Sequence, residues 1–169
     1  MTGDEESRAW VDRLAVTDLI YRYSDGVNRA DWDQVETVFA TDAVWEIPAM
    51  GVRVEGSRAF RDFMVGQRIE LLIQTPHAPV IRLLGSWQAK STTTVHEVAR
   101  MEATNESAYA EPGTQINLEQ YGIYYDDLAK IDGAWRFTHR LFVPIHIRPD
   151  CVTGEVLTPR SSLMQPVSE

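Results

Sequence analysis

The spacing of the apolar residues changes once along this chain of 169 residues, near Pro76. Upstream of Pro76, apolar residues recur every three or four positions, which is the spacing of helices that bury one side. Downstream, they recur at every second position, as on strands that bury one face. Helices followed by strands predict an α+β domain in which the helices pack on one face of a sheet.

Three helices are expected in the first half of the chain. The first spans residues 8–29 and buries a stripe made of Val16, Leu19, Ile20, Tyr23 and Val27. The second begins after Asp31, whose carboxylate is a typical N-cap, and Gln34 completes a capping box. The third begins with Ser57 as its N-cap and carries apolar residues as far as Leu72.

The strands are expected to form one curved, mostly antiparallel sheet. The Asp132-Gly133 pair is a strong hairpin signal between the last two of them. A curved sheet closed by helices forms a cone with one open end, which can hold a small molecule against apolar walls. The predicted strands cover residues 43–47, 78–89, 93–102, 115–130 and 134–147, and residues 103–114 are predicted to be a loop.

The domain organisation is expected to be simple. Residues 1–150 are predicted to form a single domain, and residues 151–169 a C-terminal tail that lies over the surface or a neighbouring subunit. On the open face of the sheet, Tyr125, Val143 and Ile145 would expose apolar area in a monomer, so a homo-oligomer is expected.

The composition excludes several classes of protein. Twenty-five acidic residues against sixteen Lys and Arg give a net charge of −9, which repels the phosphates of nucleic acids. The longest apolar runs are much shorter than the roughly 20 residues that cross a bilayer, and the acidic N-terminus is unlike a signal peptide. The single cysteine, Cys151, excludes an internal disulfide and a cysteine-rich metal site. We therefore expect a cytoplasmic protein that binds neither nucleic acid nor membrane.

Several segments, in this order along the chain, resemble the SnoaL-like branch of the NTF2-like superfamily. They are Tyr21-x-Tyr23, NRADWD at 28–33, FATDAVW at 39–45, VEGSRAF at 54–60, GIYYDDL at 122–128 and DGAWRF at 132–137. The resemblance implies the NTF2-like, or cystatin-like, cone, with three N-terminal helices packed on a strongly curved sheet. It points to the branch of scytalone dehydratase and hexachlorocyclohexane dehydrochlorinase. Because such relatives form dimers or trimers, it also implies a homodimer or homotrimer.

The activity implied by the resemblance is that of a lyase that uses side chains alone, with no metal and no organic cofactor. Enzymes of this branch remove a proton next to an activated carbon and expel water or another small group such as formaldehyde. Isomerases, polyketide cyclases and non-catalytic modules, such as the small subunits of ring-hydroxylating dioxygenases, share the cone and remain alternatives. The expected substrate is a hydrophobic, oxygenated aromatic or polycyclic molecule.

The resemblance also implies a catalytic histidine just after the third helix, oriented by an aspartate at the end of the first. His77 stands at the histidine position, and imidazole, with a pKa of about 6.5, suits a general base. Asn28 stands where the aspartate is usual; it can orient the ring but supplies no charge. Asp25, one helical turn earlier, is the alternative partner. Structural roles for His77 and Asn28, and a solvated Asp25, stay open.

Two further acid–base candidates depend on which face of a strand they occupy. Glu46 follows Trp45 on a short strand: pointing inward, it would have a raised pKa and act as a general acid, and pointing outward it would be solvated. His96 would be a second acid or base if its side of the strand faces the cavity, and a surface histidine otherwise. His139 and His146 lack a usual metal-ligand spacing, so no metal site is predicted.

The remaining candidates are aromatic or apolar. Tyr23 and Tyr124 carry hydroxyls that can hydrogen-bond a substrate oxygen, although core packing is the commoner fate of such residues. Some of the larger apolar side chains would line the cavity and favour a flat substrate, while the others form the core. These are Trp45, Phe60, Met64 and Trp87.

Overall fold

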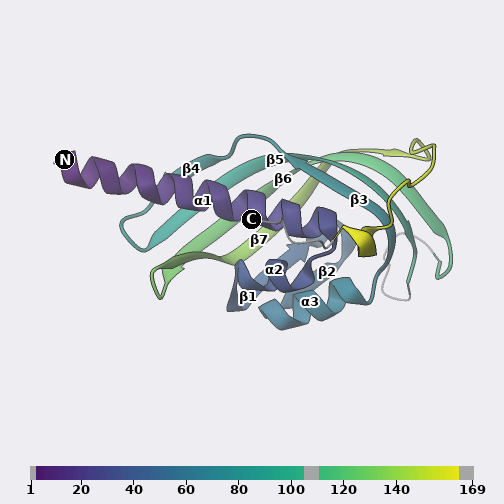
Figure 1. The fold of residues 1–169 in the computed structure, drawn as a ribbon, viewed down its shortest axis with the longest axis horizontal. Helices are drawn as coiled ribbons and strands as arrows, with labels where there is room; N and C mark the ends of the chain where they lie inside the picture. The colour runs from purple at the N-terminus through teal and green to yellow at the C-terminus, as the bar shows by residue number, and fades with distance from the viewer. Residues whose placement is uncertain (1–2, 105–110, 164–169) are drawn as a thin grey trace.

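The computed structural model describes residues 3–104 and 111–163, and in it the helices cover one face of a single curved sheet (Figure 1). Helix α1 (Gly3–Arg29) lies along the sheet, while α2 (Trp32–Thr37) and α3 (Ser57–Val65) lie beside its β1 and β2 end. The α+β order predicted from the change of periodicity is confirmed. No helix in these described ranges is long and apolar enough to cross a membrane.

Seven strands form the sheet, in the order β2-β1-β7-β6-β5-β3, and β4 also pairs with β5. All pairs are antiparallel except β1 with β7, which are parallel. The strands are β1 (Phe39–Ile47), β2 (Val52–Glu55), β3 (Arg68–Pro76), β4 (Val80–Leu83), β5 (Gln88–Glu102), β6 (Gln115–Ile131) and β7 (Ala134–Pro149).

The core lies between the helices and the covered face of the sheet. All five residues of the predicted α1 stripe are buried, with at most 3% of each exposed. Tyr23 from this stripe meets Phe39 and Phe137 edge to face, with ring centroids 5.8 and 6.1 Å apart. This aromatic contact joins α1 to β1 and β7, so the first helix is fixed over the middle of the sheet.

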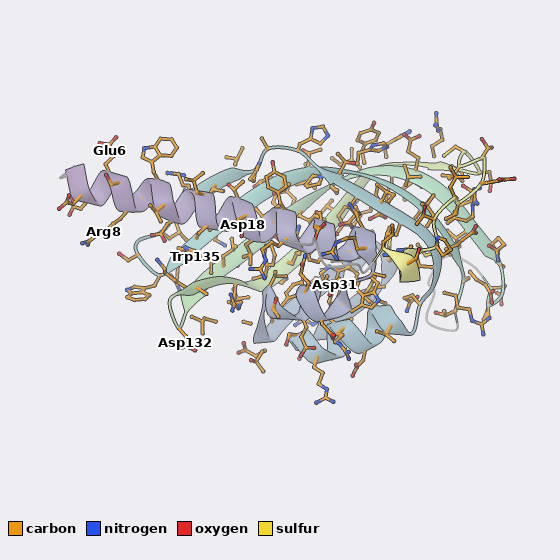
Figure 2. All side chains as sticks on the ribbon, viewed as in Figure 1. Glu6, Arg8, Asp18, Asp31, Asp132 and Trp135 are labelled. Carbon is orange, nitrogen blue, oxygen red and sulfur yellow. The ribbon has the colours of Figure 1, made fainter. Side chains whose placement is uncertain are left out.

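Local signals correctly predicted one helix cap and one hairpin turn, but not the capping box, because Gln34 Nε2 donates to the Arg22 carbonyl instead. Asp31 caps α2, because its Oδ1 accepts a hydrogen bond from the Gln34 backbone N–H at 2.9 Å. Asp132 and Gly133 form the tip of the β6–β7 hairpin, where Figure 2 shows Asp132 at one end of the molecule. Both have positive φ angles, 49° and 81°, as a tight hairpin turn requires.

The third helix is shorter than predicted. It ends at Val65, and the following apolar residues belong to β3, which pairs with β5 from Arg68 to Pro76. Apolar residues at positions 69, 71, 72 and 73 fit a helix or a buried strand equally well, and pairing along β5 decides between them. Ser57 is also not a side-chain cap, since Gly56 holds the N-cap position.

Other element boundaries differ from the prediction as well. Helix α1 begins at Gly3 instead of residue 8, and β1 begins at Phe39 instead of residue 43. The predicted strand at 78–89 is the short β4 followed by the start of β5. Of the predicted loop at 103–114, residues 105–110 lie outside the described residues.

The chain after β7 returns to the helical side of the molecule. Its described part includes a 3-10 turn, η2 (Arg160–Ser162), which lies beside the end of α1 (Figure 1). Arg160 is buried there; its guanidinium donates to the backbone carbonyl of Val27 and lies 5.5 Å from the Trp32 ring. The predicted tail therefore packs against the domain over at least residues 160–162, and its contact with a neighbouring subunit stays a prediction.

Candidate functional site

A cavity of about 160 Å³ lies between the helices and the covered face of the sheet. Its wall combines α1, α3 and six of the strands, all but β4, and most of its surface is apolar. Large side chains on this wall include Val27, Trp45, Phe63, Met64, Leu72 and Phe142. The predicted cone with an apolar interior is therefore present.

A row of three polar side chains interrupts the apolar wall. The Glu97 carboxylate accepts a hydrogen bond from Gln74 Nε2 at 2.6 Å and another from Gln120 Nε2 at 2.5 Å. Each of the three residues is more than nine-tenths buried, and all line the cavity. We call Gln74, Glu97 and Gln120 the polar row.

The sheet register brings the polar row together. Glu97 on β5 lies directly opposite Gln74 on β3 and directly opposite Gln120 on β6. Side chains at opposed positions of neighbouring strands point to the same face, so the three side chains meet on the covered face. A carboxylate between two amides satisfies both of its oxygens without a positively charged partner.

Two tyrosines extend the polar row. Gln74 Nε2 also donates to the Tyr124 hydroxyl at 3.2 Å, and the hydroxyls of Tyr124 and Tyr23 are 3.5 Å apart. Behind them, the guanidinium carbon of Arg140 lies 3.8 Å from the Tyr124 ring centroid and 4.1 Å from that of Tyr23. The tyrosines thus separate a buried cation from the cavity.

Burial controls the protonation of these groups. It raises the pKa of Glu97 above the ordinary 4.5, and this effect outweighs the two amide donors and the positive charge of Arg160. Burial also raises the pKa of Tyr124, although the charge on Arg140 opposes it. Glu97 is therefore a stronger base than a solvated carboxylate, and Tyr124 keeps its proton.

Asn28 fixes the backbone beneath the polar row. Its Oδ1 accepts from the Gln74 backbone N–H at 2.7 Å, and its Nδ2 donates to the Gln74 backbone carbonyl at 3.0 Å. Because β3 is at the edge of the sheet, these groups face no further strand, and Asn28 at the end of α1 takes the place of one. An aspartate could accept the first bond but could not donate the second.

Four of the residues predicted to form the site line the cavity. They are Tyr23, Trp45, Met64 and Tyr124. Phe60 is buried behind Trp45, with the two ring centroids 4.9 Å apart. Trp87 lies away from the cavity, in the turn between β4 and β5, where 65% of it is exposed.

The structure does not bring His77 to the cavity. It follows the end of β3 and is exposed, and its backbone N–H donates to the Thr94 carbonyl at 2.9 Å. On β3 the inward positions are Leu72 and Gln74, so Gln74 is the last cavity-lining residue of that strand. The resemblance placed the histidine after a helix, whereas a nine-residue strand separates α3 from His77.

Glu46 and Asp25 both lie outside the cavity wall in ion pairs. The Glu46 carboxylate accepts from Arg53 and from His139 Nε2, each at 2.8 Å, and these partners lower its pKa. The raised pKa considered for an inward Glu46 is thus contradicted, because Trp45 takes the inward direction. Asp25 is exposed and pairs with Arg29 at 2.6 Å.

His96 lies on the opposite face of β5 from the polar row. Its Nε2 is 2.8 Å from a Glu119 carboxylate oxygen, and its ring stacks on Tyr121 at 4.6 Å. The inward residues of β5 are the odd-numbered ones, including Val95 and Glu97. His96 therefore points away from the cavity, and its predicted role as a second acid or base there is contradicted.

Glu97, Gln74 and Gln120 were missed in the sequence. A signal for Glu97 was present, because it is the one charged residue in the otherwise apolar or small row Ser91, Thr93, Val95, Ala99 and Met101. A charged residue in such a row is either buried for function or paired. Nothing local distinguishes the two glutamines, since their importance arises from pairing across strands. Among the described residues, no group of three or more His, Cys, Asp or Glu could hold a metal ion.

Comparison with known proteins agrees with this architecture. A family model described as SnoaL-like domain matches residues 8–141. Among solved structures, a type-3 hexachlorocyclohexane dehydrochlorinase (LinA) from Novosphingobium barchaimii LL02 is similar, with a TM-score of 0.73 and 15% identity over 90% of this chain and 99% of that one. No curated protein matches the sequence.

Two further structures place the fold more broadly. A putative scytalone dehydratase from Novosphingobium aromaticivorans has a TM-score of 0.70 and 17% identity, covering 88% of this chain and 93% of that one. A protein of unknown function with a cystatin-like fold from Nostoc punctiforme has a TM-score of 0.59 and 14% identity, covering 80% and 92%. At these identities the comparisons show the NTF2-like, cystatin-like fold, and they carry no substrate to this chain.

Proposed function

This chain belongs to the family of SnoaL-like domains, and from that premise we propose that it is a cofactor-independent lyase. The proposed substrate is a hydrophobic, oxygenated aromatic or polycyclic molecule with an acidic C–H bond beside a carbonyl and a hydroxyl on the next carbon. The observation that carries the proposal is Glu97, a carboxylate with a raised pKa among the apolar walls of a cavity. Such a group is a candidate general base.

The proposed reaction is a β-elimination of water. Glu97 removes the proton next to the carbonyl, and the electron pair of that C–H bond becomes the new carbon–carbon double bond. The carbon–oxygen bond on the next carbon then breaks, and the departing hydroxyl takes a proton from Tyr124 to leave as water. Transfer of the proton from Glu97 back to Tyr124 restores the site, so the net change is loss of one water molecule.

The contacts of Tyr124 suit the role of acid. Its hydroxyl oxygen accepts a hydrogen bond from Gln74, so its own proton can be donated to a ligand or to the Tyr23 hydroxyl. Its raised pKa keeps that proton in place at neutral pH. Gln74 contacts both Glu97 and Tyr124, so one side chain positions the base and the acid relative to each other.

The test uses 3-hydroxy-1-tetralone, a bicyclic ketone whose dehydration yields 1-naphthol. We expect the purified chain to release 1-naphthol, followed by its fluorescence, faster than buffer does. Glu97→Gln should abolish the catalysed release, and Glu46→Gln, which alters a carboxylate outside the cavity wall, should retain it. His77→Ala tests the histidine base implied by the resemblance: loss of activity in this variant, with activity kept in Glu97→Gln, would refute the assignment to Glu97.

A non-catalytic ligand-binding module is the second candidate. The observation in its favour is the exposed position of His77, the residue that the resemblance implied as the base. Tight binding of naphthalene-sized ligands without any turnover of the tetralone would favour this candidate. Turnover that depends on Glu97 would exclude it.

A further inference from the structure

The amide oxygens of the polar row have no partners. In the described part of the chain, Gln74 Oε1 and Gln120 Oε1 are buried and accept no hydrogen bond. The cause is the carboxylate between them: each amide turns its nitrogen toward Glu97, which leaves its oxygen facing elsewhere. A buried acceptor without a donor destabilises the empty site, and a ligand that supplies the donor removes that cost.

The polar row is consequently rich in acceptors. Glu97 contributes a carboxylate, the two glutamines contribute two unsatisfied carbonyl oxygens, and no Lys or Arg side chain lines the cavity in the described residues. An anionic or acceptor-only group placed there would meet like partial charges. A hydroxyl or a protonated amino group would instead find several acceptors.

The cavity wall also carries a hydrogen-bond donor, in contrast to the acceptors of the polar row. The indole N–H of Trp45 is buried and donates no hydrogen bond within the described ranges. An indole nitrogen can only donate, so a carbonyl oxygen on the ligand is its natural partner. Among the described residues the Thr104 hydroxyl also has no partner, and it lines the cavity, but it can donate or accept and so does not bias the choice.

We propose that the cavity selects a flat apolar molecule whose polar end donates hydrogen bonds, from a hydroxyl or a protonated amino group, to the polar row. A carbonyl elsewhere on the same molecule accepts from Trp45. Ligands that end in a carboxylate or an ether are rejected. This inference rests on the proposed function only in taking the same cavity as the ligand site, because selective binding requires no turnover.

The test is a calorimetric titration of the full chain at pH 7 with four matched naphthalenes. Two carry donors, 2-naphthol and 2-(aminomethyl)naphthalene, and two carry none, 2-methoxynaphthalene and 2-naphthoate. We expect at least one donor ligand to bind about tenfold or more tightly than either ligand without a donor. The tighter of the two donor ligands identifies whether the natural polar end is a neutral hydroxyl or an ammonium.

A variant links the preference to the polar row. Glu97→Gln removes the negative charge and brings in an amide N–H that can donate to one of the two unsatisfied glutamine oxygens, so it should reduce the preference for the donor ligand to about threefold or less. Its affinity for 2-methoxynaphthalene should stay unchanged, which shows that the cavity is intact. Equal affinities across the series, tighter binding of the ether or the carboxylate, or no binding of any ligand would overturn the inference.

The two proposals can fail separately. A clear preference for donors without dehydration of 3-hydroxy-1-tetralone would leave this inference standing and remove the lyase activity. Dehydration that depends on Glu97, without a preference for donor ligands, would support the lyase activity and overturn this inference.

Discussion

Glu97 and Glu46 are two glutamates that each accept strong hydrogen bonds from two side chains, yet their acidities are shifted in opposite directions. Glu97 is held by two neutral amides in a buried row, and its pKa is raised. Glu46 is held by Arg53 and His139 outside the cavity wall, and its pKa is lowered. The number of hydrogen bonds is the same, so the difference comes from burial and from the charge of the donors.

The comparison teaches which carboxylate can act as a base. A carboxylate hydrogen-bonded to a cation holds a proton weakly, whereas a buried one whose hydrogen bonds come from amides holds it more strongly. Glu97 also lines the cavity of about 160 Å³, and Glu46 does not.

Replacing Glu97 should have the largest effect on activity. Glu97→Gln keeps the size of the side chain but replaces one acceptor oxygen of the carboxylate by an amide nitrogen that only donates, and so removes the base. We expect kcat/KM for dehydration of 3-hydroxy-1-tetralone to fall by about 100-fold or more. Glu46→Gln serves as the matched control and should change it by less than about threefold. Equal losses in the two variants would contradict the distinction between them.

The pH dependence of the reaction should report the raised pKa. Because the base must be ionised, kcat/KM should rise with pH through the pKa of Glu97 and then level off. That pKa lies above 4.5, so the acidic limb should have its midpoint above 4.5 as well. A profile that is already flat at pH 4.5 would mean that the acting base has an ordinary or lowered pKa.

Asn28 should matter for stability because the polar row depends on the position of Gln74. Asn28→Asp keeps one of the two hydrogen bonds to the Gln74 backbone and leaves the Gln74 backbone carbonyl without the Asn28 donor. We expect the free energy of unfolding, from urea titration, to fall by about 1–3 kcal/mol, with a larger loss in Asn28→Ala. Changes below about 0.5 kcal/mol in both variants would show that the clamp on β3 is unimportant.

The smallest expected effect is that of Glu46 on stability. Its folded pKa is lowered, so its contribution is present above the unfolded pKa and is lost as pH falls through the folded pKa. Because the ion pairs are partly exposed, Glu46→Gln should cost at most about 1 kcal/mol at pH 7 and less at pH 3. The contribution of Glu97 has the opposite sign: stability falls as pH rises from 4.5 through the raised pKa.

Thermal unfolding at several pH values can therefore sharpen the comparison. Relative to the parent chain, Glu97→Gln should gain stability between pH 4 and pH 7, because it removes the penalty of ionising a buried group. Glu46→Gln should lose stability over the same interval. Parallel curves for the two variants would contradict the opposite pKa shifts.

Much of the fold could be predicted because its signals are local. The stripe on α1, the Asp31 cap and the Asp132-Gly133 turn each lie within a few residues and do not depend on distant contacts. The end of α3 was misplaced for the opposite reason, since the apolar residues that follow it become a strand only by pairing with β5.

The candidate site was harder to predict, and the reason is geometric. A shift of one residue exchanges the two faces of a strand, and the sequence pattern left the face of His96 open, while Glu97 on the other face was not considered. Similarly, His77 lies three residues beyond Gln74, the position that reaches the cavity. The family resemblance indicated the fold, whereas the polar row follows from pairing among β3, β5 and β6, which no local pattern encodes.

The most direct test of the central claim is a carboxyl-carbon NMR titration of the chain labelled at glutamate, with Glu97→Gln and Glu46→Gln to assign the two signals. Glu97 should titrate above 4.5, and its signal should move when 2-naphthol is added at constant pH. Glu46 should titrate below 4.5 and should not respond to the ligand. A Glu97 that titrates at or below 4.5, or that is unaffected by a bound naphthol, would contradict its role as the base in this cavity.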